Sequence, residues 1–107
     1  MEKLKQKLLS YFKRHSEEYE ITWQEAEEKD ATLVDVRSRQ EYDEGHKDGA
    51  ICIPHYEIRN KAETILKQKD KAIILYCQTG ARSKKAYETL KKMGYTNVYH
   101  IKGGLEQ

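Results

Sequence analysis

The order of strand-like and helix-like segments predicts an α/β domain with a mainly parallel sheet and helices on both of its faces. Residues 32–36 are a nearly continuous β-branched run and residues 72–76 are apolar, which is typical of strands that are buried on both sides. A helix-like segment separates each strand candidate from the next, as in parallel strands joined by crossover helices. The 107 residues of the chain are enough for one hydrophobic core.

The beginning of the chain predicts an amphipathic helix over residues 3–15. Apolar residues recur at helical spacing, and lysine or arginine fills many of the other positions. The apolar positions are Leu4, Leu8, Leu9, Tyr11 and Phe12. We expect this helix to dock on the domain; the alternative is a basic helix that binds a membrane surface or a partner. Residues 1–18 are therefore assigned to an N-terminal helical extension, and residues 19–107 to the domain.

The domain is expected to begin with a short strand at residues 19–21. Thr22 and Glu25 then have the spacing of a capping box, in which the hydroxyl accepts from the Glu25 amide and the carboxylate reaches back. This pattern predicts a helix over residues 23–29, before the buried strand at 32–36.

Two more short elements follow that strand. Ser38 is an N-cap candidate for a short helix that ends at Gly45. Residues 49–54 hold a small strand, which Pro54 terminates.

The second half of the domain predicts two longer helices and a final strand. The segment 57–67 has a helical pattern, and the residues expected on its inner side are Ile58, Ala62, Ile65 and Leu66. After the buried strand at 72–76, the segment 83–93 is expected to be a helix closed by Gly94. Its inward residues are Ala86, Leu90 and Met93. Residues 97–101 are the last strand candidate.

Composition and charge exclude several classes of function. The net charge is +2, and acidic and basic residues alternate in blocks, so no basic face for nucleic acid is predicted. Two cysteines are too few for a disulfide-stapled scaffold, and the four histidines lack metal-ligand spacing. The longest apolar run, residues 72–77, is too short to span a bilayer, and no secretory signal is evident. We therefore expect a cytoplasmic protein, with a monomer as the default.

The chemistry is expected where the strand at 72–76 runs into the loop Cys77-Gln78-Thr79-Gly80-Ala81-Arg82-Ser83. Gly80 allows a tight turn that points successive amides inward, and the following helix start and Arg82 add positive charge. Such a cradle is expected to lower the pKa of the Cys77 thiol and to create a nucleophile for a small anionic substrate. The alternative is that Cys77 is a small, inert residue that closes a buried strand.

The spacing within this loop separates two chemistries. Four residues lie between Cys77 and Arg82, one fewer than cysteine phosphatases use to wrap a tetrahedral phosphate. The shorter loop favours a terminal sulfur atom held as a persulfide. A phosphatase or arsenate reductase on the same fold is the alternative that the loop length disfavours.

Three stretches of the sequence resemble rhodanese-like domains. The first is Leu33-Val34-Asp35-Val36-Arg37, followed by Glu41-Tyr42, Gly45-His46, Gly49-Ala50 and Ile53-Pro54. The second is the loop from Cys77 to Ser83, which resembles the active-site loop of single-domain thiosulfate sulfurtransferases. The third is Gly94-Tyr95, Asn97-Val98 and Gly103-Gly104-Leu105. The resemblance covers residues 20–107 and implies a five-stranded α/β sheet.

The resemblance also implies roles for individual residues. Cys77 would carry the persulfide, and the backbone amides from Gln78 to Ser83 would hold its outer sulfur. Arg82 would attract and orient a thiosulfonate anion. Asp35 and Arg37 would support the site from the end of the neighbouring strand; the alternative is a structural ion pair that includes Glu41.

The implied reaction moves a sulfane sulfur from thiosulfate, or from another persulfide donor, to cyanide or a thiol. It needs no metal or organic cofactor. Two alternatives stay open: a sulfur carrier or redox relay that receives sulfur from a partner protein, and a non-catalytic interaction module. Cys52 either resolves the Cys77 persulfide into a disulfide or is a buried residue of its short strand.

Overall fold

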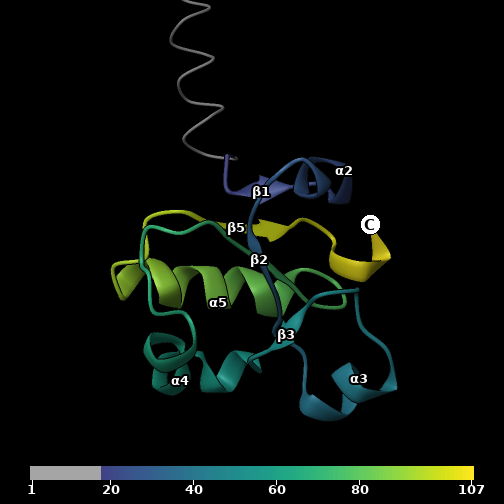
Figure 1. Ribbon diagram of the computed structural model, residues 1–107. Helices are drawn as coiled ribbons and strands as arrows, with labels where there is room; N and C mark the ends of the chain where they lie inside the picture. The colour runs from purple at the N-terminus through teal and green to yellow at the C-terminus, as the bar shows by residue number, and fades with distance from the viewer. Residues whose placement is uncertain (1–17) are drawn as a thin grey trace, which may run out of the picture.

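The computed structural model describes residues 18–107, so the helix expected over residues 3–15 lies outside the described part. In chain order the elements are β1 (Glu20–Ile21), α2 (Trp23–Glu27), β2 (Thr32–Asp35), α3 (Arg39–Glu44), β3 (Ile51–Cys52), the 3₁₀ helix η1 (His55–Glu57), α4 (Ile58–Ile65), β4 (Ile73–Tyr76), α5 (Ala81–Lys92), β5 (Val98–Ile101) and the 3₁₀ helix η2 (Gly104–Glu106) (Figure 1). Within the described residues, no helix is both long and apolar enough to cross a bilayer.

The strands form one sheet in the order β1-β5-β4-β2-β3, and every pairing in it is parallel. This arrangement confirms the predicted α/β fold with five strands. The central strand β4 is buried along its whole length, because it pairs with β2 on one side and β5 on the other. The strands β1 and β3 form the two edges and have only two residues each.

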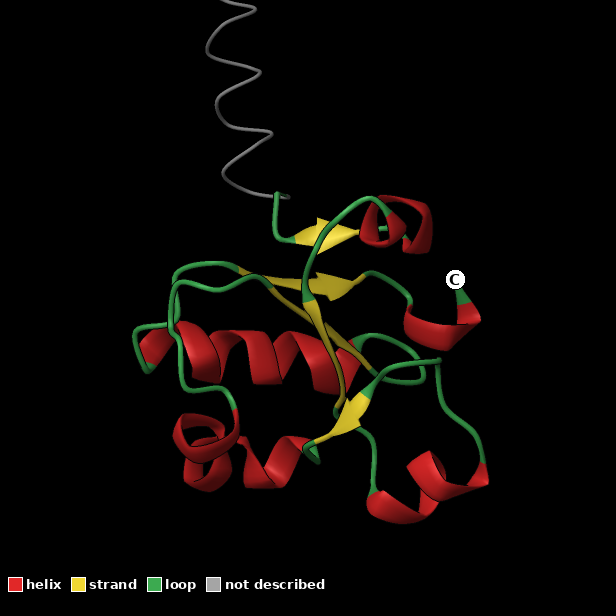
Figure 2. Ribbon diagram, viewed as in Figure 1, coloured by secondary structure: helices red, strands yellow, loops and turns green. Residues whose placement is uncertain are grey.

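Helices cover both faces of the sheet (Figure 2). Side chains alternate between the faces along each strand. Val34 and Leu75 pack in the larger core with α4 and α5. Leu33 and Ile74 point to the other face, where α2, α3 and η2 pack. Both strands carry apolar residues on both faces because each contributes to both cores.

The predicted helix caps of the first half are confirmed. Thr22 and Glu25 form a complete capping box at the start of α2. Ser38 and Glu41 form another at the start of α3, and Gly45 follows the last residue of that helix. Each box satisfies two backbone N–H groups that would otherwise lack a partner.

One inward residue was predicted wrongly. Ile65, expected on the inner side of its helix, is 45% exposed. The reason is that α4 stops at Ile65, and Leu66 leaves helical geometry with φ −106° and ψ 75°. This change of direction buries Leu66 instead, and the Tyr95 hydroxyl donates to the Leu66 carbonyl at 2.7 Å.

The start of α5 also differs from the prediction. The helix begins at Ala81, two residues before the expected Ser83, because Gly80 occupies the N-cap position with φ +99°. Arg82 and Ser83 consequently belong to the first turn of the helix. The end of α5 agrees better with expectation, since Met93 is the C-cap and Gly94 follows with φ +96°.

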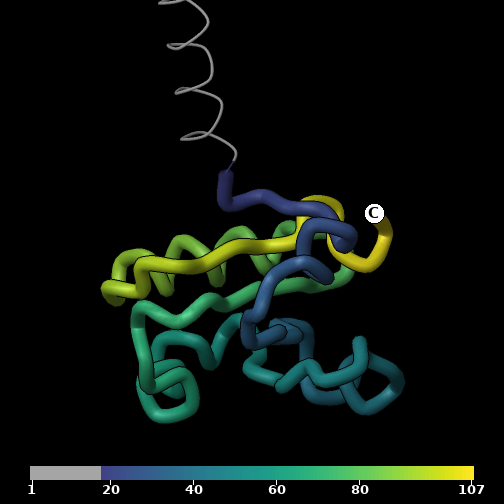
Figure 3. Tube along the Cα trace, turned by 45° about the horizontal axis from the view of Figure 1, so that its top comes forward, coloured from purple at the N-terminus to yellow at the C-terminus, as the bar shows by residue number. Residues whose placement is uncertain are grey.

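The two ends of the described chain lie beside each other. Figure 3 shows the purple segment of β1 and α2 next to the yellow C-terminal segment. The Trp23 indole N–H donates to the Gly104 carbonyl at 3.0 Å, and the Trp23 backbone N–H donates to the Gln107 side chain at 2.9 Å. These bonds hold η2 against the edge of the domain, where it reaches the loop that follows β4.

Candidate active site around Cys77

Cys77 is the first residue after β4, at the carboxyl end of the central strand. Ligand sites of open parallel sheets lie at this end. Its side chain is 0% exposed and packs in the core beneath α5. The backbone N–H groups of Gly80 and Ser83 donate to Cys77 Sγ at 3.1 and 3.3 Å. Two N–H donors on one sulfur, at the N-terminus of a 12-residue helix, form an arrangement that stabilises a thiolate.

The loop residues predicted to hold the transferred sulfur divide into two groups. Gly80 and Ser83 are buried and face Cys77. Thr79 and Ala81 are exposed, and the Gln78 side chain donates to Glu106 at 3.4 Å. The structure thus brings the amides of Gly80 and Ser83 to the sulfur itself.

The C-terminal segment that contains Gly103 and Gly104 packs against the Cys77 loop and fixes its position. The N–H groups of Leu105 and Glu106 donate to the carbonyls of Cys77 and Gln78 at 3.0 and 3.1 Å. A Cβ atom on Gly104 would lie within 2.3 Å of the Cys77 carbonyl oxygen, and φ at this residue is +59°. Only glycine therefore allows the backbone to approach this closely. The Gly103-Gly104-Leu105 sequence is a direct structural support of the loop.

Arg82 reaches the sequence-distant helix α3. Its guanidinium donates to both carboxylate oxygens of Glu41, at 2.7 and 3.0 Å. The hydrogen bonds from Arg82 lower the pKa of Glu41 to about 2, and Glu41 in turn raises the pKa of Arg82. The expected association of Glu41 with Asp35 and Arg37 is therefore replaced by a pair with Arg82.

Asp35 and Arg37 form a buried ion pair with each other. Their closest contact is 2.7 Å between Arg37 Nη2 and Asp35 Oδ2, and Arg37 also donates to the Gly45 carbonyl at 2.6 Å. Asp35 follows the alternation of Leu33, so it lies on the face of the sheet opposite Cys77. This geometry fits the alternative interpretation, in which Asp35 and Arg37 form a structural ion pair.

Cys52 is too far from Cys77 for a disulfide in this fold. Their strands, β3 and β4, lie on opposite sides of β2, which pairs with both of them. Two strand spacings amount to about 9.5 Å, whereas disulfides need Cα atoms within about 7 Å. Both cysteines are free, and burial raises the pKa of the Cys52 thiol. The interpretation of Cys52 as a buried strand residue fits the structure.

The site prediction included Ser83 but missed two polar residues that line up behind it, His100 and Glu20. Ser83 Oγ lies 3.6 Å from Cys77 Sγ and 2.8 Å from His100 Nδ1. His100 Nε2 lies 3.5 Å from Glu20 Oε2 on β1. The sequence signal for His100 was its place among the apolar residues of β5, since a histidine at an inward strand position needs a polar partner.

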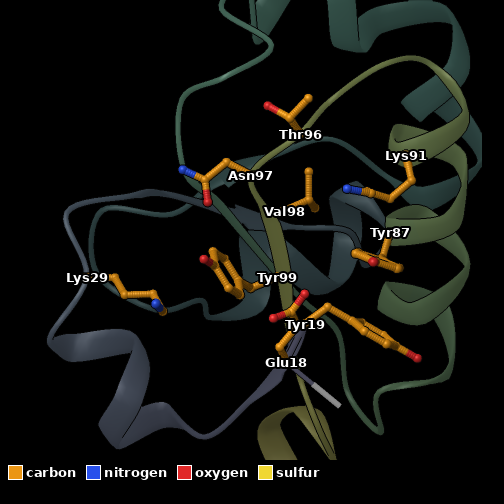
Figure 4. Close-up of a pocket in the computed structure, with 9 residues that line it drawn as sticks. All are labelled: Glu18, Tyr19, Lys29, Tyr87, Lys91, Thr96, Asn97, Val98 and Tyr99. Atoms are coloured by element: carbon orange, nitrogen blue, oxygen red, sulfur yellow. The ribbon is translucent and has the colours of Figure 1, made fainter. Parts of the chain in front are cut away.

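A pocket of about 390 Å³ lies elsewhere on the domain (Figure 4). Part of its lining lies at the amino end of β5, where Thr96 and Asn97 precede Val98, whereas Cys77 lies at the carboxyl end of β4. Figure 4 also shows Tyr19 beside Tyr87 in this pocket, and their rings stack at 4.1 Å. This pocket is therefore separate from the site around Cys77.

Within residues 18–107, no group of three or more His, Cys, Asp or Glu side chains could hold a metal ion. His46 instead stacks on the ring of Tyr42, with 3.6 Å between ring centroids.

These features agree with comparisons to known proteins. The chain matches the rhodanese-like domain family over residues 18–107. A rhodanese from E. coli, solved with anions, is 37% identical with a TM-score of 0.65, and the match covers 71% of this chain and 88% of that one. The chain therefore belongs to the rhodanese-like domain family.

Two further relatives differ in how much they share with this chain. The tRNA uridine(34) hydroxylase of Erwinia tasmaniensis is 44% identical over 80 residues, which are 71% of this chain but 23% of that protein. The human single-domain sulfurtransferase TSTD1 has a TM-score of 0.73 at 24% identity, covering 80% of this chain and 90% of that one. The human structure supports the fold alone.

Proposed function

We propose that this chain is a sulfurtransferase that carries a sulfane sulfur as a persulfide on Cys77. The observation that carries the proposal is the pair of N–H groups, from Gly80 and Ser83, that donate to Cys77 Sγ at 3.1 and 3.3 Å. An ionised cysteine attacks a sulfur electrophile directly, so the reaction needs no separate base once the thiolate has formed. Membership of the rhodanese-like family and the similarity to a rhodanese support this chemistry.

The proposed cycle has two displacements at sulfur. The Cys77 thiolate attacks the outer sulfur of thiosulfate; the new bond is S–S, and the electron pair of the broken S–S bond leaves with sulfite. The persulfide anion then loses its outer sulfur to cyanide as thiocyanate, or to a thiolate as a new persulfide, and the Cys77 thiolate returns. Sulfur and charge balance in both steps without a redox cofactor.

Thiosulfate is the proposed donor because Arg82 places a cation in the first turn of α5, beside the loop. A guanidinium matches a sulfonate group in charge and hydrogen-bonding geometry. The presence of anions in the E. coli relative supports an anionic donor. The match spans 23% of the Erwinia tasmaniensis hydroxylase, so tRNA hydroxylation is not part of this proposal.

A thiocyanate assay tests the proposal. The wild-type chain is incubated with thiosulfate and cyanide, beside Cys77→Ala and the control Cys52→Ala. Thiocyanate formation by wild type and by the Cys52 variant, with loss in the Cys77 variant, supports the sulfurtransferase. Equal rates in all three would show that Cys77 carries no sulfur.

One observation favours a second candidate, a sulfur carrier that is loaded by a protein persulfide. Glu41 already occupies both arms of the Arg82 guanidinium, which reduces its attraction for a dianion. A carrier would be loaded quickly by a low-molecular-weight persulfide and slowly by thiosulfate. Comparing the loading rates for the two donors separates the candidates.

A further inference from the structure

A continuous row of polar groups leads from the sulfur of Cys77 to the edge of the sheet. Cys77 Sγ lies 3.6 Å from Ser83 Oγ, and Ser83 Oγ lies 2.8 Å from His100 Nδ1. His100 Nε2 then lies 3.5 Å from Glu20 Oε2. The first three groups are buried, with His100 only 2% exposed, while the Glu20 side chain is 19% exposed. The row therefore connects a fully buried thiol with a carboxylate that reaches solvent.

The position of His100 has no structural explanation without this row. It occupies a strand whose other buried members are Val98 and Ile101. Its Nε2 atom is buried and has no partner within hydrogen-bond distance among the described residues, and the carboxylate of Glu20 is the group that faces it. Since a buried polar group without a partner costs free energy, such a histidine in β5 points to a role.

We propose that Ser83, His100 and Glu20 form a relay that removes the proton of Cys77 and thereby generates its thiolate. The inference rests on the proposed role of Cys77 as the nucleophile. His100 and Glu20 are positioning residues, because they act on the sulfur through the hydroxyl of Ser83.

The proton movement balances at each atom. The Cys77 S–H bond breaks and its proton passes to Ser83 Oγ, while the original hydroxyl proton of Ser83 passes to His100 Nδ1. The new hydroxyl of Ser83 then donates to the thiolate, and the imidazolium of His100 faces the Glu20 carboxylate. In the resting state Ser83 Oγ also lies 3.2 Å from the Gly80 carbonyl, so its hydroxyl has a second acceptor.

The groups around His100 act in both directions on its capacity to hold this proton, and the carboxylate of Glu20 is the one that favours the imidazolium. Burial lowers the pKa of His100, Glu20 opposes this effect, and Lys84 on α5 adds to the lowering. Tyr19 stacks on the ring at 5.7 Å between centroids. On the sulfur side, Arg82 pairs with Glu41 at 2.7 Å, and the charges of Cys77 and Arg37 also act on Arg82.

The test is the pH dependence of alkylation of Cys77 by iodoacetamide, measured at the peptide level so that Cys52 is counted separately. This reagent is uncharged and needs no sulfur transfer. The variants are Ser83→Ala, His100→Asn and Glu20→Gln, with His46→Asn as the control for loss of a histidine. Near-ultraviolet circular dichroism checks the fold of each variant.

Loss of Ser83 or His100 is expected to move the midpoint of the alkylation profile up by about one pH unit, which slows alkylation up to about tenfold at pH values below both midpoints. The plateau at high pH should not change, because a thiolate formed by hydroxide reacts as before. Glu20→Gln should move the midpoint in the same direction by less, and His46→Asn should leave it in place. A merely structural role of His100 would lower the plateau and leave the midpoint unchanged.

The relay is overturned if folded Ser83→Ala and His100→Asn variants keep the wild-type midpoint. If His100→Asn does not fold, an unchanged midpoint in Glu20→Gln overturns it equally, since Glu20 lies on an edge strand. A shifted midpoint in a chain that forms no thiocyanate would uphold the relay and contradict only the proposed sulfurtransferase.

Discussion

Glu41 and Arg82 are 41 positions apart in the sequence and form an ion pair with two hydrogen bonds, of 2.7 and 3.0 Å. Glu41 also closes the capping box of α3, so one carboxylate ties that helix to the first turn of α5. The pair holds the Arg82 guanidinium near Cys77, and Glu41 accepts hydrogen bonds from its N–H groups. The behaviour of the site toward anions therefore depends on Glu41 as much as on Arg82.

Replacing Glu41 by glutamine is expected to speed the loading of sulfur from thiosulfate severalfold. Glutamine keeps the helix cap but removes the charge that neutralises Arg82. The measurement is the second-order rate of persulfide formation, with Glu44→Gln, an exposed residue of the same helix, as control. Slower loading in Glu41→Gln than in the control would mean that the pair holds Arg82 in its working position.

The same pair gives the stability of the protein a defined dependence on pH. Glu41 has its pKa lowered from 4.5 to about 2 by the hydrogen bonds from Arg82, so it binds its proton more weakly in the folded state. Its contribution is therefore complete above pH 4.5 and is lost as the pH falls toward 2. For a partly exposed pair we expect about 0.5–1 kcal/mol.

Urea unfolding of wild type and Glu41→Gln at several pH values measures this contribution. The difference in the free energy of unfolding should be constant from pH 7 to pH 5 and should shrink below pH 4.5. A difference that grows on acidification would contradict the assigned pKa direction.

Gly104→Ala is expected to disrupt the Cys77 loop. The added Cβ would overlap the Cys77 carbonyl oxygen, so either η2 or the loop must move. We expect a loss of about 3 kcal/mol of stability and a loss of sulfur loading.

Gly49→Ala is the matched control, because Gly49 has φ +80° and open space around its Cβ position. It should cost only the backbone strain, about 1–2 kcal/mol, and should leave loading unchanged. Equal effects of the two changes would argue against the close contact.

Asp35→Asn tests whether the buried pair with Arg37 is structural. Arg37 would be left buried without its partner charge, which typically costs about 3–5 kcal/mol. Asp43→Asn, an exposed change on α3, should stay within about 0.5 kcal/mol of wild type. The folded fraction of Asp35→Asn should load sulfur at the wild-type rate, because Asp35 lies on the face of the sheet opposite Cys77. Unchanged stability with lost loading would assign Asp35 to the active site instead.

Much of the fold could be predicted because its signals are local. The apolar runs in β2 and β4, the capping boxes at Thr22 and Ser38, and the glycine after α5 each depend on neighbouring residues. The inward position of Ile65 was predicted wrongly because periodicity alone does not show where a helix stops.

Some residues of the candidate site could likewise be predicted from the sequence, and others could not. Cys77 and its loop could be found from their sequence, since a strand, a cysteine, a glycine and an arginine are contiguous there. The partners of the site could not, because Glu41, His100 and Glu20 reach it from other strands and helices. Only the sheet order places β5 beside β4 and β1 beside β5.

The central claim is that Cys77 carries one sulfur atom, and intact mass after incubation with thiosulfate tests it most directly. We predict that the wild-type chain gains the mass of one sulfur, that Cys77→Ala gains nothing, and that cyanide removes the added mass as thiocyanate. A chain that stays unmodified with thiosulfate and with a low-molecular-weight persulfide, or a sulfur that also appears on Cys77→Ala, would contradict the account.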